Sequence, residues 1–312
     1  MDPVVDTFAG ISAKARRFAW FLKVVFRPVF RYSPLTPFML RLAVVFEWFA
    51  SFVVPAARDT EVERVAFPGF HGEWLRPPGA DPRKVLLFLH GGGFFCCGLR
   101  THRRLAARIG QRAGLTVLSV AYRHLPKAPL SVSMADAHHA YTWLIEQGFE
   151  DVVLAGDSAG GFLALTTALE ARDSGQPSPA ALVVMSPLVD LDHVGRAAHP
   201  NLMLDAYIPA HRLPKLRKML VAGLDADPSP IHRELAGLPP VLVQAGGGEA
   251  LLYDAYLLAG RLQAAGVPCR FQVWEGQVHV FQAFAGSVPE GHAALDEIGA
   301  FLRAATTQDR AA

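Results

Sequence analysis

GDSAGG, residues 156–161, carries the strongest fold signal in this 312-residue chain. It follows the apolar run 152–155 and comes directly before a helical pattern over residues 159–172. A G-x-S-x-G sequence between a strand and a helix is typical of a nucleophile elbow, a tight turn that presents the serine hydroxyl at one edge of a sheet. This context favours the elbow over an ordinary N-cap serine. Ser158 is therefore the predicted nucleophile, and Asp157 is expected to hold the turn together rather than to do chemistry.

A second glycine-rich stretch, HGGGF at residues 90–94, ends the apolar run 85–90. Three consecutive glycines let backbone amides approach a ligand without side chains in the way. An HGGG segment after this strand supplies half of the oxyanion hole in lipases and esterases. A glycine triplet alone is more often a flexible loop, so the indication depends on its pairing with GDSAGG. Cys96 and Cys97, just beyond, are interpreted as small apolar residues rather than as thiol nucleophiles.

Strand and helix patterns alternate from residue 61 onward, which predicts an α/β fold. We expect a mostly parallel eight-stranded sheet with helices on both faces and a helical cap. Together with the GDSAGG and HGGGF motifs this indicates an α/β-hydrolase fold. The strand patterns lie at residues 61–67, 72–77, 85–90, 116–120, 152–156, 181–186, 241–246 and 269–274. Helices are expected over residues 101–113, 132–147 and 159–172.

Two segments interrupt this rhythm and define the predicted organisation. Residues 1–60 are aromatic-rich and helical in pattern, and residues 190–238 break the alternation. The first is predicted to be an N-terminal helical cap segment and the second a cap insertion. Residues 61–189 and 239–312 then form the catalytic domain. The pocket is expected beneath the two cap segments, whose apolar side chains suit an acyl or alcohol group: Trp20, Phe21, Phe38, Trp48, Phe49, Leu202 and Met203.

HGGGF, GDSAGG and a histidine just after the last strand, at position 279, resemble the hormone-sensitive-lipase branch of the α/β-hydrolases. The resemblance spans about residues 60–305. It implies a carboxylesterase acting on short- to medium-chain esters without a cofactor. It also implies that the oxyanion donors are the backbone amides of Gly92, Gly93 and Ala159.

The general base has to follow the nucleophile and the acid, because the chain order in this fold is serine, acid, histidine. His279 is the only histidine between Leu235 and Gly291, and it lies just past the strand pattern 269–274. His279 is therefore the predicted base. His292, in the last helical region, is the weaker alternative.

Two residues compete for the role of the acid. The resembled family usually has an aspartate at the start of a D-P-L-x-D-E segment after the seventh strand. The stretch GGGEALLYD, residues 246–254, stands there, and aligning Leu251 places Glu249 at the position of that aspartate. A glutamate can orient an imidazole as an aspartate does. Asp254, five residues further on, remains the alternative.

Composition limits the partners. Hydrophobic residues make up 51% of the chain, and the net charge of +2 is too small to indicate nucleic acid binding. No zinc-ligand spacing and no phosphate loop occur, so neither a metal nor a cofactor is expected. Three cysteines, two of them adjacent, favour a cytoplasmic location. No signal peptide or membrane span is expected, and the pattern over residues 38–54 indicates an amphipathic helix.

The N-terminal arm has two interpretations. Seven cations and no acid occur from Lys14 to Arg41, which suits either a surface that rests peripherally on anionic lipid or a cap with solvated cations. The cap interpretation is favoured, and a homodimer is left open. The predicted function is a serine carboxylesterase. A lactonase or amidase-like acylhydrolase would use the same residues, and a non-catalytic receptor of the same fold is the alternative from another class.

Overall fold

The computed structural model describes residues 3–34, 36, 38–40, 42, 60–192, 194–208 and 212–307. Its centre is a nine-stranded sheet in the order β1-β9-β8-β7-β6-β4-β5-β3-β2. All neighbours pair in parallel except β3, which is antiparallel to β5 and to β2. The strands are β1 (Asp6–Phe8), β2 (Glu61–Phe67), β3 (Phe70–Arg76), β4 (Asp81–Leu89), β5 (Leu115–Ala121), β6 (Asp151–Asp157), β7 (Leu182–Met185), β8 (Val241–Gly246) and β9 (Cys269–Trp274).

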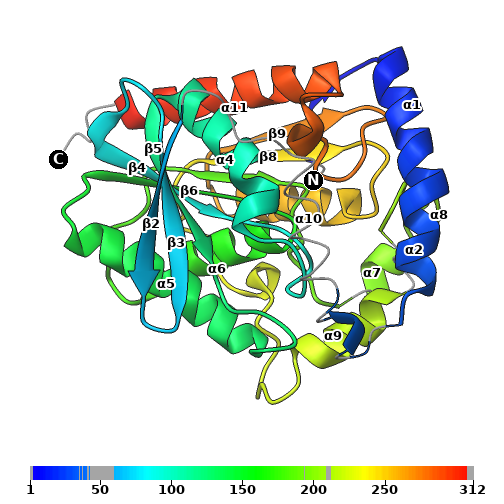
Figure 1. Ribbon diagram of the computed structural model, residues 1–312, viewed down its shortest axis with the longest axis horizontal. Helices are drawn as coiled ribbons and strands as arrows, with labels where there is room; N and C mark the ends of the chain where they lie inside the picture. Colours follow the sequence, from blue (N-terminus) through cyan, green and yellow to red (C-terminus); the bar gives the residue numbers. More distant parts are fainter. Residues whose placement is uncertain are drawn as a thin grey trace.

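Helices cover both faces of this sheet (Figure 1). One face packs on α5 (Leu130–Glu146), α6 (Ala159–Asp173) and α10 (Leu252–Ala264). The other packs on α4 (Leu99–Ala113) and α11 (Pro289–Thr307). Residues 85–89 of β4 alternate between the two cores and are all buried, as expected for a parallel strand covered on both sides.

The predicted strand count was wrong by one. The ninth strand, β1, comes from the N-terminal segment that was expected to be helical only. β1 pairs in parallel with β9 at the sheet edge, where Phe8 stacks on Trp274 with ring centroids 4.0 Å apart. Three residues are too short to show an alternating pattern, so this strand depends on its contacts with β9.

The rest of the described N-terminal arm is helical. α1 (Ala13–Phe21), the π-helical turn η1 (Leu22–Phe26) and α2 (Arg27–Tyr32) run along one side of the molecule, next to α8 (Asn201–Leu204) (Figure 1). Arg27 Nη2 donates to the carbonyl oxygen of Met203 at 2.6 Å, so the arm contacts the segment between β7 and β8. Most of the predicted amphipathic helix at 38–54 lies outside the described residues.

The segment between β7 and β8 consists of short helices: α7 (Val194–Ala197), α8, α9 (Leu213–Leu220) and the 3₁₀ turn η3 (Pro230–His232). No helix among the described residues is long and apolar enough to cross a membrane. The carboxyl ends of β4, β6, β7, β8 and β9 meet at one edge of the sheet, which is where the predicted site residues lie.

Candidate active site

Ser158 occupies a strained turn between β6 and α6. Its φ of 53° and ψ of −117° form a conformation that side-chain-bearing residues rarely adopt. The turn can close only around glycines. A Cβ on Gly156 would lie 2.3 Å from the carbonyl oxygen of Gly160, and a Cβ on Gly160 would lie 1.9 Å from that of Leu89. The structure therefore has the elbow geometry that the sequence predicts.

Three backbone N–H groups of the two glycine-rich segments are available to a ligand. Among the described residues, the amides of Gly92, Gly93 and Ala159 have no hydrogen-bond acceptor. Gly92 and Gly93 are half-buried and Ala159 is buried. Backbone donors that are shielded from water are almost always paired, so these three unpaired donors suit an oxygen atom of a ligand. Ala159 also begins the 15-residue helix α6, whose N-terminus carries a partial positive charge. This arrangement suits a developing oxyanion.

The elbow and the HGGGF loop are held together by Asp157. Its Oδ1 accepts a hydrogen bond from the N–H of Gly91 at 3.1 Å, and its Oδ2 lies 3.2 Å from His102 Nε2. Gly91 cannot carry a side chain here, since a Cβ would lie 2.1 Å from Asp157 Oδ2. Asp157 thus has the structural position predicted for it, between the two halves of the site.

Glu249 and His279 are hydrogen-bonded to each other. Glu249 Oε2 bonds His279 Nδ1, while Oε1 accepts from the N–H of Gly246 at 2.8 Å. Both side chains are buried, with Glu249 at 0% and His279 at 5% exposure. Gly246 is needed for this approach, because a Cβ there would lie 2.5 Å from the carbonyl oxygen of Gln277.

The pKa of His279 is raised above its ordinary value. Burial alone would lower the pKa, because an apolar environment disfavours the charged ring. The charge of Glu249 and its hydrogen bond outweigh burial, and the charges of Asp205 and Asp157 act in the same direction. The surroundings of His279 therefore stabilise its protonated form.

The loop that carries His279 is fixed to the same sheet edge as the elbow. Ser186, directly after β7, accepts a hydrogen bond at its Oγ from the N–H of Val280 at 3.0 Å. The N–H of Ser158 donates to the carbonyl oxygen of Met185 at 2.9 Å. Among the described residues the Ser158 hydroxyl itself has no hydrogen-bond partner, and it does not bond His279 in this structure.

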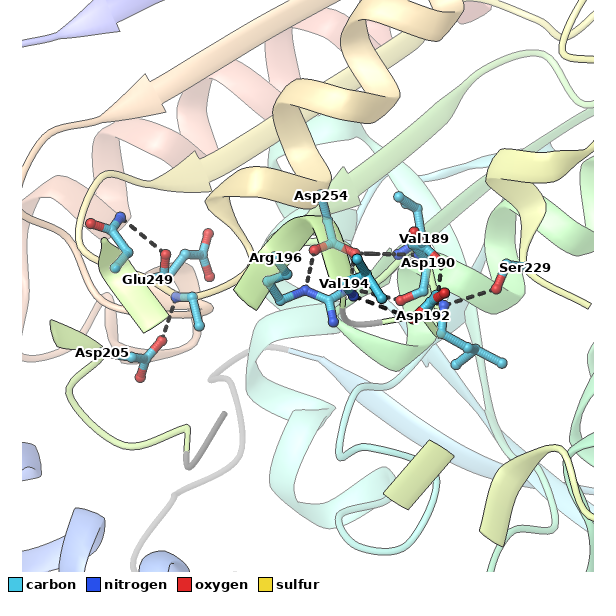
Figure 2. Close-up of polar contacts among 12 residues, drawn as sticks. Val189, Asp190, Asp192, Val194, Arg196, Asp205, Ser229, Glu249 and Asp254 are labelled. Atoms are coloured by element: carbon cyan, nitrogen blue, oxygen red, sulfur yellow. Dashed lines mark hydrogen bonds and ion pairs between the residues drawn. The ribbon is translucent and has the colours of Figure 1, made fainter. Parts of the chain in front are cut away.

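The alternative residues lie elsewhere. Asp254 does not bond His279: its carboxylate pairs with Arg196, and Figure 2 shows this pair apart from Glu249. His292 lies on α11, where its Nδ1 is 3.1 Å from Arg112 Nη2. Among the described residues, no group of three or more His, Cys, Asp or Glu side chains could hold a metal ion.

Three residues near Glu249 and His279 were not identified from the sequence. Asn201, Asp205 and Tyr207, all between β7 and β8, hydrogen-bond the loops of Glu249 and His279. No short motif marks them, because their partners lie 45 to 72 residues away in the chain. Only the folded chain brings them to the site.

The fold and the arrangement around Ser158 define an α/β-hydrolase. Residues 86–283 match the family described as alpha/beta hydrolase fold, and the chain belongs to that family. It is also 35% identical to a solved esterase from the bacterial hormone-sensitive lipase family, with a TM-score of 0.85 over 95% of this chain and 99% of that chain. The predicted membership of the hormone-sensitive-lipase-like branch is confirmed.

Two curated relatives come from Mycobacterium tuberculosis (strain ATCC 25618 / H37Rv). Esterase LipU is 39% identical over 272 residues, covering 82% of this chain and 91% of LipU. Carboxylesterase/phospholipase LipF is 37% identical over 320 aligned residues, covering 97% of this chain and 85% of LipF.

Proposed function

We propose that this chain is a serine carboxylesterase in which Ser158 is the nucleophile, His279 the general base and Glu249 the acid that orients it. The observation that carries the proposal is the buried Glu249–His279 hydrogen bond at the sheet edge that also holds the strained Ser158. Esterase and carboxylesterase are the names of its relatives, which supports the same reaction class.

In the first half of the reaction, His279 removes the proton of the Ser158 hydroxyl as it attacks the ester carbonyl carbon. In unliganded enzymes such catalytic hydrogen bonds often form only when substrate binds. The carbonyl oxygen becomes an oxyanion that accepts hydrogen bonds from the amides of Gly92, Gly93 and Ala159. Protonated His279, stabilised by Glu249, then gives its proton to the leaving alcohol, and an acyl group remains on Ser158.

In the second half, a water molecule attacks the acyl group while His279 accepts its proton. The same three amides hold the second oxyanion. Collapse of this intermediate breaks the bond to Ser158, whose oxygen recovers a proton from His279. The products are a carboxylic acid and the free enzyme, and the cycle requires no redox step.

The substrate class is a carboxylic ester with a short to medium acyl chain. A lactone or an amide could enter the same cycle, because the nucleophile, base and oxyanion donors do not distinguish them. A purely ligand-binding role is less well supported, since Ser158, Glu249 and His279 all occur together. The test is hydrolysis of aryl esters of increasing chain length, with fluorophosphonate labelling mapped by mass spectrometry. Labelling at a residue other than Ser158, or no turnover of any ester by folded protein, would overturn the proposal.

We propose that residues 1–60 and 190–238 act as the cap over this site, with residues 61–189 and 239–312 as the catalytic domain. Contacts of the described residues support this division. Leu216 Cδ2, in α9, lies 3.7 Å from the point where a Cβ on Gly93 would be, so α9 lies beside the HGGGF loop. Arg212 Nη1 donates to the carbonyl oxygen of Phe30 at 2.8 Å, which connects the two cap segments.

The outer side of the N-terminal arm suits peripheral contact with an anionic lipid surface. Trp20 is 66% and Phe38 73% exposed, so these two rings do not lie in a covered pocket, and the prediction that they line it was wrong. Tyr32 is 76% exposed as well. Cations alternate with the exposed apolar residues and no acid occurs from Lys14 to Pro34. Such a surface combines apolar insertion with attraction to anionic headgroups. The exposed apolar side chains of the arm's helices are Trp20, Phe21, Val24, Val25, Val29 and Tyr32.

Co-sedimentation with phosphatidylglycerol vesicles tests this contact. The double variant Trp20→Ser/Tyr32→Ser should no longer sediment with the vesicles. The double variant Lys23→Glu/Arg31→Glu should stop sedimenting with anionic vesicles only, and its sedimentation with neutral vesicles should be unchanged. Val62→Ser removes an exposed valine of the remote strand β2 and serves as control. Equal sedimentation of all four proteins would show that the N-terminal arm does not contact the vesicles.

A cytoplasmic location and a homodimer remain predictions. Analytical ultracentrifugation tests the homodimer.

A further inference from the structure

Asp205 is a buried carboxylate without a basic partner among the residues that the structure describes. It is only 1% exposed. Its Oδ1 accepts hydrogen bonds from the backbone N–H groups of Tyr207 at 2.9 Å and Ile208 at 2.7 Å, and its Oδ2 accepts from the N–H of Ala250 at 2.7 Å. Within the described part of the chain, Asp205 forms no ion pair with Lys, Arg or His. A buried charge is costly unless compensated, so the position of this one calls for an explanation.

Asp205 holds the loop that carries the proposed acid. Its partner Ala250 directly follows Glu249, and Figure 2 shows Asp205 and Glu249 together on the same side of the site. Asn201, four residues earlier, donates from Nδ2 to the carbonyl oxygens of Gly247 at 2.8 Å and Glu249 at 3.1 Å. The segment of residues 201–208 therefore forms three hydrogen bonds with the loop of Glu249.

The same segment also contacts the proposed base. Tyr207 donates its hydroxyl to the carbonyl oxygen of His279 at 2.5 Å, and the two rings meet edge to face with centroids 5.9 Å apart. Asp205 fixes the backbone at Tyr207 through the N–H groups of residues 207 and 208. Asp205 is thus connected to both partners of the Glu249–His279 hydrogen bond.

We propose that Asp205 is a positioning residue for the acid–base pair, whose buried negative charge also stabilises His279 when it becomes protonated during attack by Ser158. The inference rests on the proposed function. It adds a second carboxylate, donated by the cap insertion, to a pair carried by the catalytic domain. Within the described part of the chain, the cation that compensates Asp205 is then the imidazolium formed in the reaction.

The charges around His279 agree with this role. Glu249 contacts the ring directly, Asp205 approaches from the segment between β7 and β8, and Asp157 lies at the end of β6. All three raise the pKa of His279 against the opposing effect of burial. Tyr207, whose ring also contacts His279, has its pKa raised by burial first and then by the charges of Asp205 and Glu249, so it stays neutral.

The experiment measures the rate at which a fluorophosphonate labels Ser158 as a function of pH, because this rate follows the fraction of His279 in its basic form. Removing a nearby negative charge lowers the pKa of His279. In Asp205→Asn the acid limb should therefore move to lower pH, so that at low pH the rate relative to its plateau rises by about threefold or more. The plateau itself should fall by about threefold to tenfold, because a weaker base removes the serine proton more slowly.

Asn201→Ala is the matched control, since it removes hydrogen bonds from the same segment to the same loop without removing a charge. Its plateau should fall while its acid limb stays in place. An unmoved acid limb in Asp205→Asn, or an equal shift in both variants, would overturn the charge effect. Asp205→Ser is a second neutral variant for the case that the asparagine protein does not fold, as judged by circular dichroism. No labelling of the unsubstituted protein at any pH would instead refute the proposed function.

Discussion

Arg196 and Asp254 form a buried, two-point ion pair between helices α7 and α10. Arg196 Nε lies 2.6 Å from Asp254 Oδ2, and Nη2 lies 2.6 Å from Oδ1 (Figure 2). The side chains are 1% and 0% exposed. Arg196 also donates to the carbonyl oxygen of Asp190, and Asp254 accepts from the N–H of Val189. The alternative candidate for the acid is therefore fully occupied in anchoring the insertion to the sheet's helical layer.

Asp254→Asn is consequently expected to reduce stability rather than catalysis. It leaves the Arg196 charge buried without its partner, which typically costs about 3–5 kcal/mol. The melting temperature should fall by about 5–10 °C, with kcat little changed at temperatures where the protein is folded. The double substitution Arg196→Met/Asp254→Leu removes both charges and should recover most of the loss in a thermal melt. An Asp254→Asn protein with the same melting temperature as the unsubstituted protein would contradict this account.

Glu249→Gln should lower kcat by several orders of magnitude with little effect on the melting temperature. The glutamine oxygen can keep the hydrogen bond from Gly246, which leaves its NH₂ group facing His279 Nδ1. His279 would then carry its proton on Nε2, where it cannot accept the serine proton. Steady-state kinetics measure the effect, with Glu275→Gln, an exposed residue after β9, as control. If Glu249→Gln and Glu275→Gln had the same kcat, Glu249 would not be the acid of this site.

Gly160→Ala should abolish activity and destabilise the fold, because its Cβ would lie 1.9 Å from the carbonyl oxygen of Leu89. The contact would be between two backbone segments, so no flexible side chain can move aside. The elbow itself would have to shift to remove the clash. Gly260→Ala is the control, since a Cβ at that helical position meets nothing within 4 Å. It should be neutral or stabilising by about 0.5–1 kcal/mol. Esterase activity and thermal melts of the two variants decide, and a fully active Gly160→Ala enzyme would disprove the tight elbow.

His90 should make the protein sensitive to acid. Burial, followed by the charge of His102, lowers the pKa of His90 to about 3, and its ring stacks on Tyr122. In the unfolded chain the pKa is about 6.5, so the unfolded state binds the extra proton between those values. The stability that neutral His90 provides is therefore complete above pH 6.5 and is lost as the pH falls toward 3.

Urea unfolding from pH 7 to pH 4 measures this dependence. His90→Phe keeps a ring on Tyr122 without a titrating group, so its stability should fall less steeply with acid, by about 1 kcal/mol per pH unit. His279, whose pKa is raised, contributes in the opposite direction in both proteins, so the comparison isolates His90. His71→Gln, at an exposed position, should keep the steep dependence. Parallel curves for all three proteins would show that His90 is not responsible.

Elements with local signals could be predicted from the sequence. GDSAGG identified the turn at Ser158 because a strand, a closed turn and a helix impose their residue types within a few positions. The buried parallel strands appeared as short apolar runs, and chain order alone pointed to His279. These features depend on backbone geometry and burial, which neighbouring residues encode.

Which side chains meet could not be predicted without the folded structure. Glu249 and Asp254 stand five residues apart with the same charge, and sequence order could not exclude either. Folding places Glu249 against His279, while Asp254 is drawn to Arg196, 58 residues away in the chain. β1 forms by pairing with β9. Asp205 reaches the Glu249 loop only because the segment between β7 and β8 folds against it. The physical reason is that ion pairs and hydrogen bonds depend on distances of a few ångströms, which the chain sets only when distant segments pack.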